Sequence, residues 1–156
     1  MVTIPQYCAY FTELRYGDIV IPTKRKATFS SKSILEVIIM KNYAKTNIGT
    51  EGRVELHDTL GLTGAEVSIN ALPAGAGVPF VHSHKENEEI YGILSGHGKA
   101  VIDGEEIPLA AGDWLRIAPA AKRQFSAAND AGITYVCVQV KANSLGGFTA
   151  EDAVVD

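Results

Sequence analysis

The sequence predicts an all-β domain, built as a sandwich or a barrel. From Arg53 onward the chain consists of short runs of β-type residues, separated by turn residues at fairly even spacing, and this pattern is typical of such folds. The sequence contains no long amphipathic helix, internal repeat or low-complexity segment. Its 156 residues fit one domain and suffice to bury a sizeable core.

Two terminal segments are less patterned than the centre. Residues 1–50 are predicted to form an irregular N-terminal arm with one strand near residues 34–40, and this arm packs on or swaps onto the barrel formed by residues 51–142. Residues 143–156 are expected to form a loose tail. A short helix is predicted to begin at Thr149, because a threonine N-cap is followed by acidic residues in the first turn.

The central strands follow from alternation and from turn residues. Residues 65–72 alternate apolar and polar side chains and are ended by the Pro-Ala-Gly-Ala-Gly run at 73–77. We expect strands at 78–84 and 89–94, then a turn at 95–98 and a tight hairpin at Asp103-Gly104. The further strands are expected at 99–102, 106–109, 114–117, 124–127 and 133–140.

Composition excludes several classes of function. The formal net charge is −4, and no basic run is longer than Lys24-Arg25-Lys26, so we expect no nucleic-acid partner. The longest apolar run, at 34–40, is short and contains Glu36, so it cannot cross a bilayer and no membrane partner is expected. The N-terminus lacks a basic start followed by an apolar stretch, which predicts a cytoplasmic location.

The two cysteines, Cys8 and Cys137, are too few for a disulfide framework. Cys137 lies in an apolar run at 135–140. This environment indicates a buried thiol rather than a nucleophile.

The most informative segment is His82-Ser-His84, followed by Glu88-Glu89. On an extended chain, two histidines one residue apart point to the same side. A carboxylate across a short turn can reach the same point. Two imidazoles and a carboxylate then form a metal site with positions left open for water or substrate.

These residues also carry a family resemblance. The pattern Pro73-Ala-Gly-x5-Val-His82-x-His84-x4-Glu89-x6-Gly96 resembles the first motif of the cupin superfamily, and the stretch from Asp103 to Pro119 resembles the second. The resemblance covers about residues 65–140. It implies a jelly-roll β-barrel (double-stranded β-helix) whose inner face holds one divalent transition metal, with His82, His84 and Glu89 as ligands.

Two neighbouring carboxylates compete for the ligand position. Glu89 is preferred because it stands six residues before Gly96 and shares a strand face with Tyr91. Glu88 lies on the opposite face, where a solvated turn carboxylate is the simpler interpretation. Glu88 and Tyr91 are nevertheless the candidate catalytic residues, because either can move a proton beside the metal.

The second motif departs from the family at Arg123, where the resemblance implies a fourth histidine ligand. A protonated guanidinium cannot bind a metal. Three alternatives follow: a metal (Mn, Fe, Zn or Ni) with three protein ligands, a replacement ligand, or no metal at all. The candidate replacements are Gln124, Gln139 and His57. Without a metal, Arg123 would pair with Glu89 or bind an anionic ligand.

The expected function is that of a metal-binding protein acting on a small oxygenated compound, such as a sugar, sugar acid or keto acid. A metal with open positions supports isomerase, decarboxylase or lyase chemistry as a Lewis acid. The alternatives are a non-catalytic small-molecule-binding protein and, with iron, a dioxygenase. Exposed sheet edges and the resemblance to small one-domain cupins also predict a homodimer.

Overall fold

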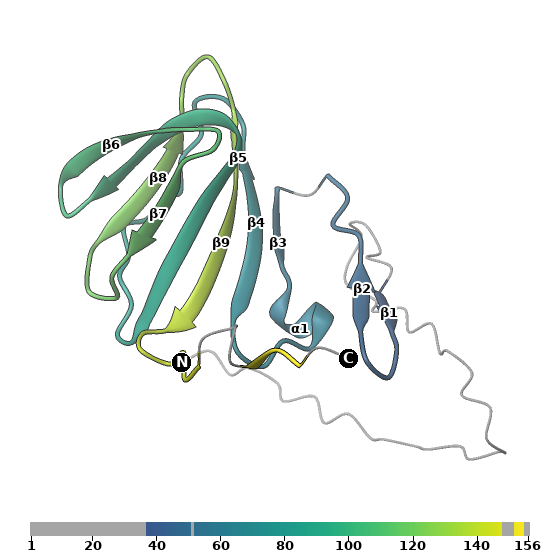
Figure 1. Ribbon diagram of the computed structural model, residues 1–156. Helices are drawn as coiled ribbons and strands as arrows, with labels where there is room; N and C mark the ends of the chain where they lie inside the picture. Colours follow the sequence, from purple (N-terminus) through teal and green to yellow (C-terminus); the bar gives the residue numbers. More distant parts are fainter. Residues whose placement is uncertain (1–36, 51, 148–151, 155–156) are drawn as a thin grey trace, which may run out of the picture.

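The fold consists almost entirely of antiparallel strands (Figure 1). The computed structural model describes residues 37–50, 52–147 and 152–154. Its elements are β1 (Val37–Ile39), β2 (Ala44–Thr46), β3 (Arg53–Glu55), α1 (His57–Leu60), β4 (Glu66–Leu72), β5 (Asn87–Ile102), β6 (Glu105–Ala110), β7 (Trp114–Ile117), β8 (Arg123–Ala127) and β9 (Ile133–Lys141).

The long strand β5 connects two groups of strands (Figure 1). Its first part pairs with β9 on one side and β7 on the other, and β9 continues through β4 to β3. Its second part pairs with β6 and β8. In the described residues the barrel is not closed, because the path of paired strands runs from β3 to β6 without returning to its start.

Gly96 allows β5 to pass from one group to the other. It has φ +75°, and a Cβ atom at this position would lie 1.8 Å from the carbonyl oxygen of Gly132. Only glycine can occupy such a crowded left-handed position. The turn predicted at 95–98 is therefore wrong: a shift of register between Ile93 and Ser95 bends the strand, which then continues.

The strand predicted at 78–84 is also absent from the structure. This segment runs beside β8 and makes only isolated bridges to it, such as the one between His82 and Arg123. The backbone nitrogens of His82 and Arg123 each donate to the other's carbonyl oxygen, at 3.2 and 2.9 Å. Pro79 has no backbone N–H to donate, which is one reason why a regular ladder does not form.

Most other predicted strands are confirmed. β4, β7, β8 and β9 agree with the predicted ranges to within one residue at each end. The hairpin between β5 and β6 turns on Asp103 and Gly104, both with positive φ, as a type I′ turn requires. No sequence pattern predicted α1, where the Glu66 carboxylate accepts the backbone N–H groups of Leu56 and His57.

The core lies between the two groups of strands and contains a stack of three aromatic rings. The ring centroids of Tyr91 and Phe125 are 4.3 Å apart, and those of Phe125 and Tyr135 are 5.3 Å apart. These rings are almost fully buried. They also line a cavity above the core, so the same residues stabilise the fold and form the floor of the candidate site.

In the N-terminal arm, β1 and β2 form a separate hairpin that contacts α1. The strand predicted near 34–40 is confirmed for Val37–Ile39. Residues 1–36 of the arm and the start of the helix predicted at Thr149 lie outside the described residues. The division into arm, barrel and tail therefore stays a prediction. Within the described residues, no helix is long and apolar enough to cross a membrane.

Candidate metal centre

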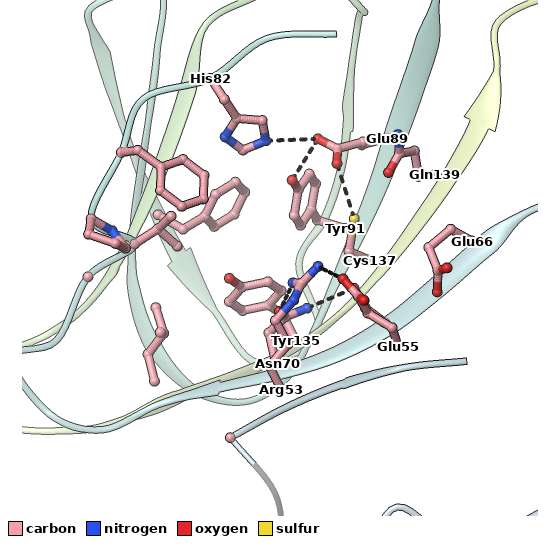
Figure 2. A pocket seen from close by; sticks show the side chains of 18 of the residues that line it. Arg53, Glu55, Glu66, Asn70, His82, Glu89, Tyr91, Tyr135, Cys137 and Gln139 are labelled. Carbon is pink, nitrogen blue, oxygen red and sulfur yellow. Dashed lines mark hydrogen bonds and ion pairs between the residues drawn. The ribbon is translucent and has the colours of Figure 1, made fainter. Parts of the chain in front are cut away.

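A cavity of about 560 Å³ opens beside the aromatic core (Figure 2). Its wall comes from β3, β4, β5, β9 and the segment before β5. Three of the four β4 side chains that line the cavity are polar: Glu66, Ser68 and Asn70, the last two almost fully buried. Val67 and Ile69 lie on the opposite face of the strand. This arrangement indicates a site for a polar ligand.

His82, His84 and Glu89 meet on this wall. One ligand atom from each lies within 4.8 Å of the others. The Nε2 atom of His84 is 3.0 Å from Oε1 of Glu89, and Nε2 of His82 is 4.0 Å from Oε2. The structure thus brings together the three residues that the motif predicted as metal ligands.

The backbone holds these side chains from two directions. Glu89 lies on β5 between Ile117 of β7 and Gln139 of β9, so it is fixed inside a sheet. The two histidines lie on the irregular segment beside β8. The backbone nitrogen of His84 donates to the carbonyl oxygen of Pro119 at 2.8 Å, which fixes this segment to the loop before β8.

The ligand atoms fit a transition metal. Nε2 of His84 and Nδ1 of His82 are buried, and neither makes a hydrogen bond of regular geometry among the described residues, although Glu89 lies 3.0 Å from the first. Buried polar atoms without partners are uncommon, and a metal would satisfy the one on His84. Imidazole nitrogens with a carboxylate suit zinc, iron, manganese or nickel.

The ionisation of these side chains favours metal binding. Burial lowers the pKa of His82 below 6.5, assisted by the charge of Arg123 and opposed by that of Glu89. Burial alone would raise the pKa of Glu89, but the hydrogen bond from Tyr91 and the charges of His84 and Arg123 bring it below 4.5. At neutral pH the site therefore holds a neutral His82 imidazole and a carboxylate, both of which are metal ligands.

Tyr91 lies beside the centre, as predicted. Its hydroxyl donates to Oε2 of Glu89 at 2.7 Å, and it lines the cavity. Burial raises the pKa of Tyr91, and the nearby Glu89 and Cys137 raise it further. The hydroxyl therefore stays protonated and holds the carboxylate in place. Its catalytic role stays a prediction.

Arg123 is fully buried and faces Glu89, with its Nε atom 3.1 Å from Oε2. Its terminal nitrogens donate to three backbone carbonyls of the loop before β8, those of Ala118, Pro119 and Ala121. The guanidinium is therefore occupied by the protein itself, and Arg123 is not among the cavity-lining residues. Of the roles predicted for Arg123, this geometry favours the pairing with Glu89 over the binding of an anionic ligand.

The candidates for a fourth metal ligand lie in different places. Gln124 does not line the cavity, and its side-chain nitrogen donates to the carbonyl oxygen of Val78 at 2.8 Å. His57 is on α1 beside Asp58. Gln139 lines the cavity, and its amide nitrogen is 3.4 Å from Nδ1 of His84. Among these three, only Gln139 contacts a residue of the triad.

Glu88 points to the outer face of the sheet, as the alternation along β5 predicted. Its carboxylate accepts a hydrogen bond from Nε of the exposed Arg116 at 2.5 Å. It does not line the cavity. The proton-transfer role predicted for Glu88 therefore has no support from its position, whereas Tyr91 is well placed.

Sequence reasoning missed the wall opposite the triad. Arg53, Glu55, Asn70 and Tyr135 all line the cavity, and Figure 2 shows them grouped together. They come from β3, β4 and β9, and no local motif links them. The alternation of residues 65–72 predicted a polar face on this strand, but not that this face would line the cavity.

The interpretation of Cys137 as a buried thiol agrees with the structure. Its Sγ atom donates to Oε1 of Glu89 at 3.6 Å. Burial raises the pKa of Cys137 to about 12, and the charge of Glu89 adds to this effect. The thiol therefore stays protonated at neutral pH and is not a nucleophile.

Three comparisons relate this chain to known proteins. The Cupin domain family matches residues 69–139. A cupin protein from Bacteroides fragilis is 69% identical with a TM-score of 0.73, and the similarity covers 75% of this chain and 99% of that one. A sugar phosphate isomerase of the cupin superfamily from Silicibacter pomeroyi is 28% identical with a TM-score of 0.51, over 58% of this chain and 60% of that one. Curated proteins gave no match.

A likeness in fold alone comes from a Cupin 2 conserved barrel domain protein of Salinispora arenicola, at 21% identity and a TM-score of 0.51, over 62% of this chain and 82% of that one. The Bacteroides fragilis protein matches 75% of this chain at 69% identity, and this match shows the family. The chain belongs to the cupin family.

Proposed function

We propose that the protein binds one divalent transition metal through His82, His84 and Glu89 and acts on a small oxygenated compound, such as a sugar, sugar acid or keto acid. The observation that carries the proposal is the convergence of these three side chains on an open cavity. A cavity of about 560 Å³ lies within the range of small-molecule sites. The name of the Silicibacter pomeroyi relative, a sugar phosphate isomerase, supports a sugar-like substrate.

When bound, the metal supplies Lewis-acid stabilisation of negative charge on substrate oxygens, which serves isomerase, decarboxylase or lyase chemistry. The protein's own residues prepare the site for this role. Tyr91 fixes the Glu89 carboxylate by its hydrogen bond. Because its hydroxyl stays protonated, Tyr91 is suited to hold this carboxylate rather than to remove a proton from a substrate. The aromatic floor formed with Phe125 keeps water from this side of the substrate.

Gln139 is the residue best placed to orient His84. If the amide oxygen of Gln139 accepts the proton on Nδ1 of His84, the lone pair on Nε2 is free for the metal. Amide oxygen and nitrogen positions follow from the hydrogen-bond network, and neighbours of this kind fix the tautomer of metal-binding histidines. Gln139 therefore supports the three-ligand site, whereas the Gln124 amide donates to the carbonyl oxygen of Val78.

The experiment that tests this proposal follows the exchange of substrate protons with D₂O by NMR. Protein loaded with Mn, Fe, Zn or Ni is incubated with aldoses, sugar acids and keto acids. We expect metal-dependent exchange beside the carbonyl, or loss of CO₂ from a keto acid, that disappears in the Glu89→Gln variant. If no compound reacts with any of the four metals, the catalytic part of the proposal is wrong.

A non-catalytic binding protein is the second candidate, and one observation favours it. The Arg123 guanidinium pairs with Glu89, so a positive charge already lies beside the carboxylate that the metal requires. Like charges repel, which weakens metal binding. Absence of stoichiometric metal after purification, together with binding of small molecules, would favour this candidate. With iron bound, oxygen consumption would favour the dioxygenase alternative.

A further inference from the structure

Arg53 provides a positive charge on the cavity wall opposite the metal-ligand triad. Figure 2 shows it beside Asn70 and Tyr135, away from His82. It lies on β3 directly opposite Asn70 of β4. Among the described residues that line the cavity, Arg53 is the only lysine or arginine. A ligand in the cavity therefore meets a fixed cation at this end.

Buried polar groups hold the Arg53 side chain in this position. One terminal nitrogen of Arg53 donates to Oδ1 of Asn70. The Asn70 side chain is only 4% exposed, and its amide nitrogen donates to Oγ of Ser68 at 3.1 Å. Because Asn70 and Ser68 are fixed in β4, the guanidinium is preorganised toward the cavity. Preorganised charges bind ligands with a smaller entropic cost.

The second partner of Arg53 is easily replaced. Its other terminal nitrogen donates to Oε1 of Glu55 at 2.7 Å, and the two side chains are 58% and 61% exposed. Exposed ion pairs add little to stability. An incoming oxyanion can therefore take the place of Glu55 and form the paired hydrogen bonds that guanidinium groups make with carboxylates and phosphates.

Tyr135 adds a hydroxyl donor close to Arg53. Burial raises the pKa of Tyr135 to about 12, although the charge of Arg53 opposes this shift. The hydroxyl is therefore protonated at neutral pH. Arg53 and His82 line the same cavity, whose volume of about 560 Å³ suits a single small molecule. One ligand can therefore contact both ends.

We infer that Arg53, positioned by Asn70, binds the anionic group of a small-molecule ligand, a phosphate or a carboxylate, while its oxygenated end lies at His82, His84 and Glu89. The inference deepens the proposed function and rests on it for the metal end. It defines the substrate class as anionic. Arg53 serves this role from the cavity wall, whereas Arg123 is occupied by Glu89 and backbone carbonyls.

Isothermal titration with three probes of one carbon skeleton tests this inference. Glucose is neutral, glucose 6-phosphate carries a phosphate and glucuronate carries a carboxylate. With manganese-loaded protein, we expect at least one anionic probe to bind at least about tenfold more tightly than glucose, by paired hydrogen bonds to the guanidinium. The better of the two anions identifies which group the site takes.

Two variants should shift anion binding in opposite directions. Arg53→Gln removes the cation and should abolish the preference for the anionic probe. Glu55→Gln removes the competing carboxylate and should strengthen anion binding by about 1.4- to fivefold, the free-energy range of an exposed pair. Arg116→Gln is the matched control, because Arg116 pairs with Glu88 on the outer face. This variant should prefer the anionic probe over glucose as strongly as the wild type does. A general loss of structure cannot produce opposite shifts.

Metal analysis of the same samples separates this inference from the proposed function. Protein that lacks metal but still prefers the anionic probe would overturn the proposed metal site and keep the anion site. Protein that holds metal but binds no anionic probe more tightly than glucose would overturn the inference. It is equally overturned if the Arg53→Gln variant, folded by circular dichroism, retains the preference. If that variant does not fold, unchanged anion binding in Glu55→Gln contradicts the inference.

Discussion

Arg123 and Glu89 form a buried ion pair, with Nε of the arginine 3.1 Å from Oε2 of the carboxylate. The same arginine exchanges backbone hydrogen bonds with His82. One residue thus holds both an imidazole and the carboxylate of the candidate metal centre. Arg123 stands where the cupin resemblance implies a fourth ligand. Its charge compensates Glu89 when no metal is bound and opposes a metal when one arrives.

Replacing Arg123 by histidine should tighten metal binding. The variant removes a positive charge beside Glu89 and adds an imidazole, so we expect the affinity for Zn²⁺ to rise by at least about tenfold, or about 1.4 kcal/mol. Competition with a chelating dye measures this change. Arg116→His, on the outer face beside Glu88, is the control and should leave the affinity unaltered. Equal affinities of wild type and Arg123→His would show that Arg123 has no influence on the centre.

The Arg123→Gln variant should be markedly less stable without metal. Removing one partner of a buried ion pair leaves the other charge uncompensated, at a cost of about 3–5 kcal/mol. The three carbonyl contacts of the guanidinium are lost as well. Urea unfolding in the presence of EDTA measures the free energy of unfolding. A loss below about 1 kcal/mol would mean that the pair behaves like an exposed one.

Replacing Tyr91 by phenylalanine should weaken both the metal-free fold and metal binding. The variant removes the hydrogen bond to Glu89 but keeps the ring in the aromatic stack with Phe125. Hydrogen bonds to charged groups contribute about 1.5–3 kcal/mol, and the loss of such a partner reduces metal affinity by about 10- to 100-fold. Urea unfolding and zinc titration measure the two effects. If both the free energy of unfolding and the zinc affinity are unchanged, Tyr91 does not support the metal centre.

The metal-free protein should lose stability as the pH falls. The pKa of His82 lies below its ordinary 6.5, so below that pH the unfolded chain binds the proton more readily and is favoured. The pKa of Glu89 lies below 4.5, so its contribution is present above that pH and is lost as the pH falls through the lowered value. Urea unfolding across this range measures both steps. In the Glu89→Gln variant the loss of stability at the lower pH should disappear. If that loss persists, it belongs to another carboxylate.

The first motif and the hairpins were readable from the sequence because their spacing is local. The turn at Asp103-Gly104 and the His82-Ser-His84 pair depend only on neighbouring residues. The failure at 95–98 has a physical cause. Gly96 lies in a continuous strand, where its lack of a side chain lets the backbone of Gly132 come close. Glycine is also common in turns, so the local sequence cannot show which of the two structures forms.

The wall around Arg53 could not be predicted for a different reason. Its residues come from three strands that meet only in the folded chain, and Arg53 reaches Asn70 through the register of β3 and β4. The most buried side chains of β4, Ser68 and Asn70, are polar, opposite to the usual rule that apolar side chains face inward. The partner of Arg123 was left open between Glu89 and an anionic ligand for the same reason: that contact depends on tertiary packing.

The homodimer stays a prediction, and Trp114 offers a way to test it. The Trp114 ring packs over Gly92, where a Cβ atom would come within 2.6 Å of it, yet 65% of Trp114 is exposed. An exposed aromatic side chain on a sheet face is typical of interfaces. We expect light scattering to give twice the 16.7 kDa chain mass, and Trp114→Glu to shift the protein toward monomer. A monomeric wild type would contradict this prediction.

Anomalous diffraction from crystals grown with manganese shows directly whether a metal binds at the three side chains. We expect one strong anomalous peak within bonding distance of His82, His84 and Glu89, and none in the Glu89→Gln variant. The Glu88→Gln variant, altered on the outer face, should retain the peak. The opposite result, with no peak at the three side chains for manganese, iron, zinc or nickel while Glu89 remains paired with Arg123, would show that this cupin is not a metal-binding protein.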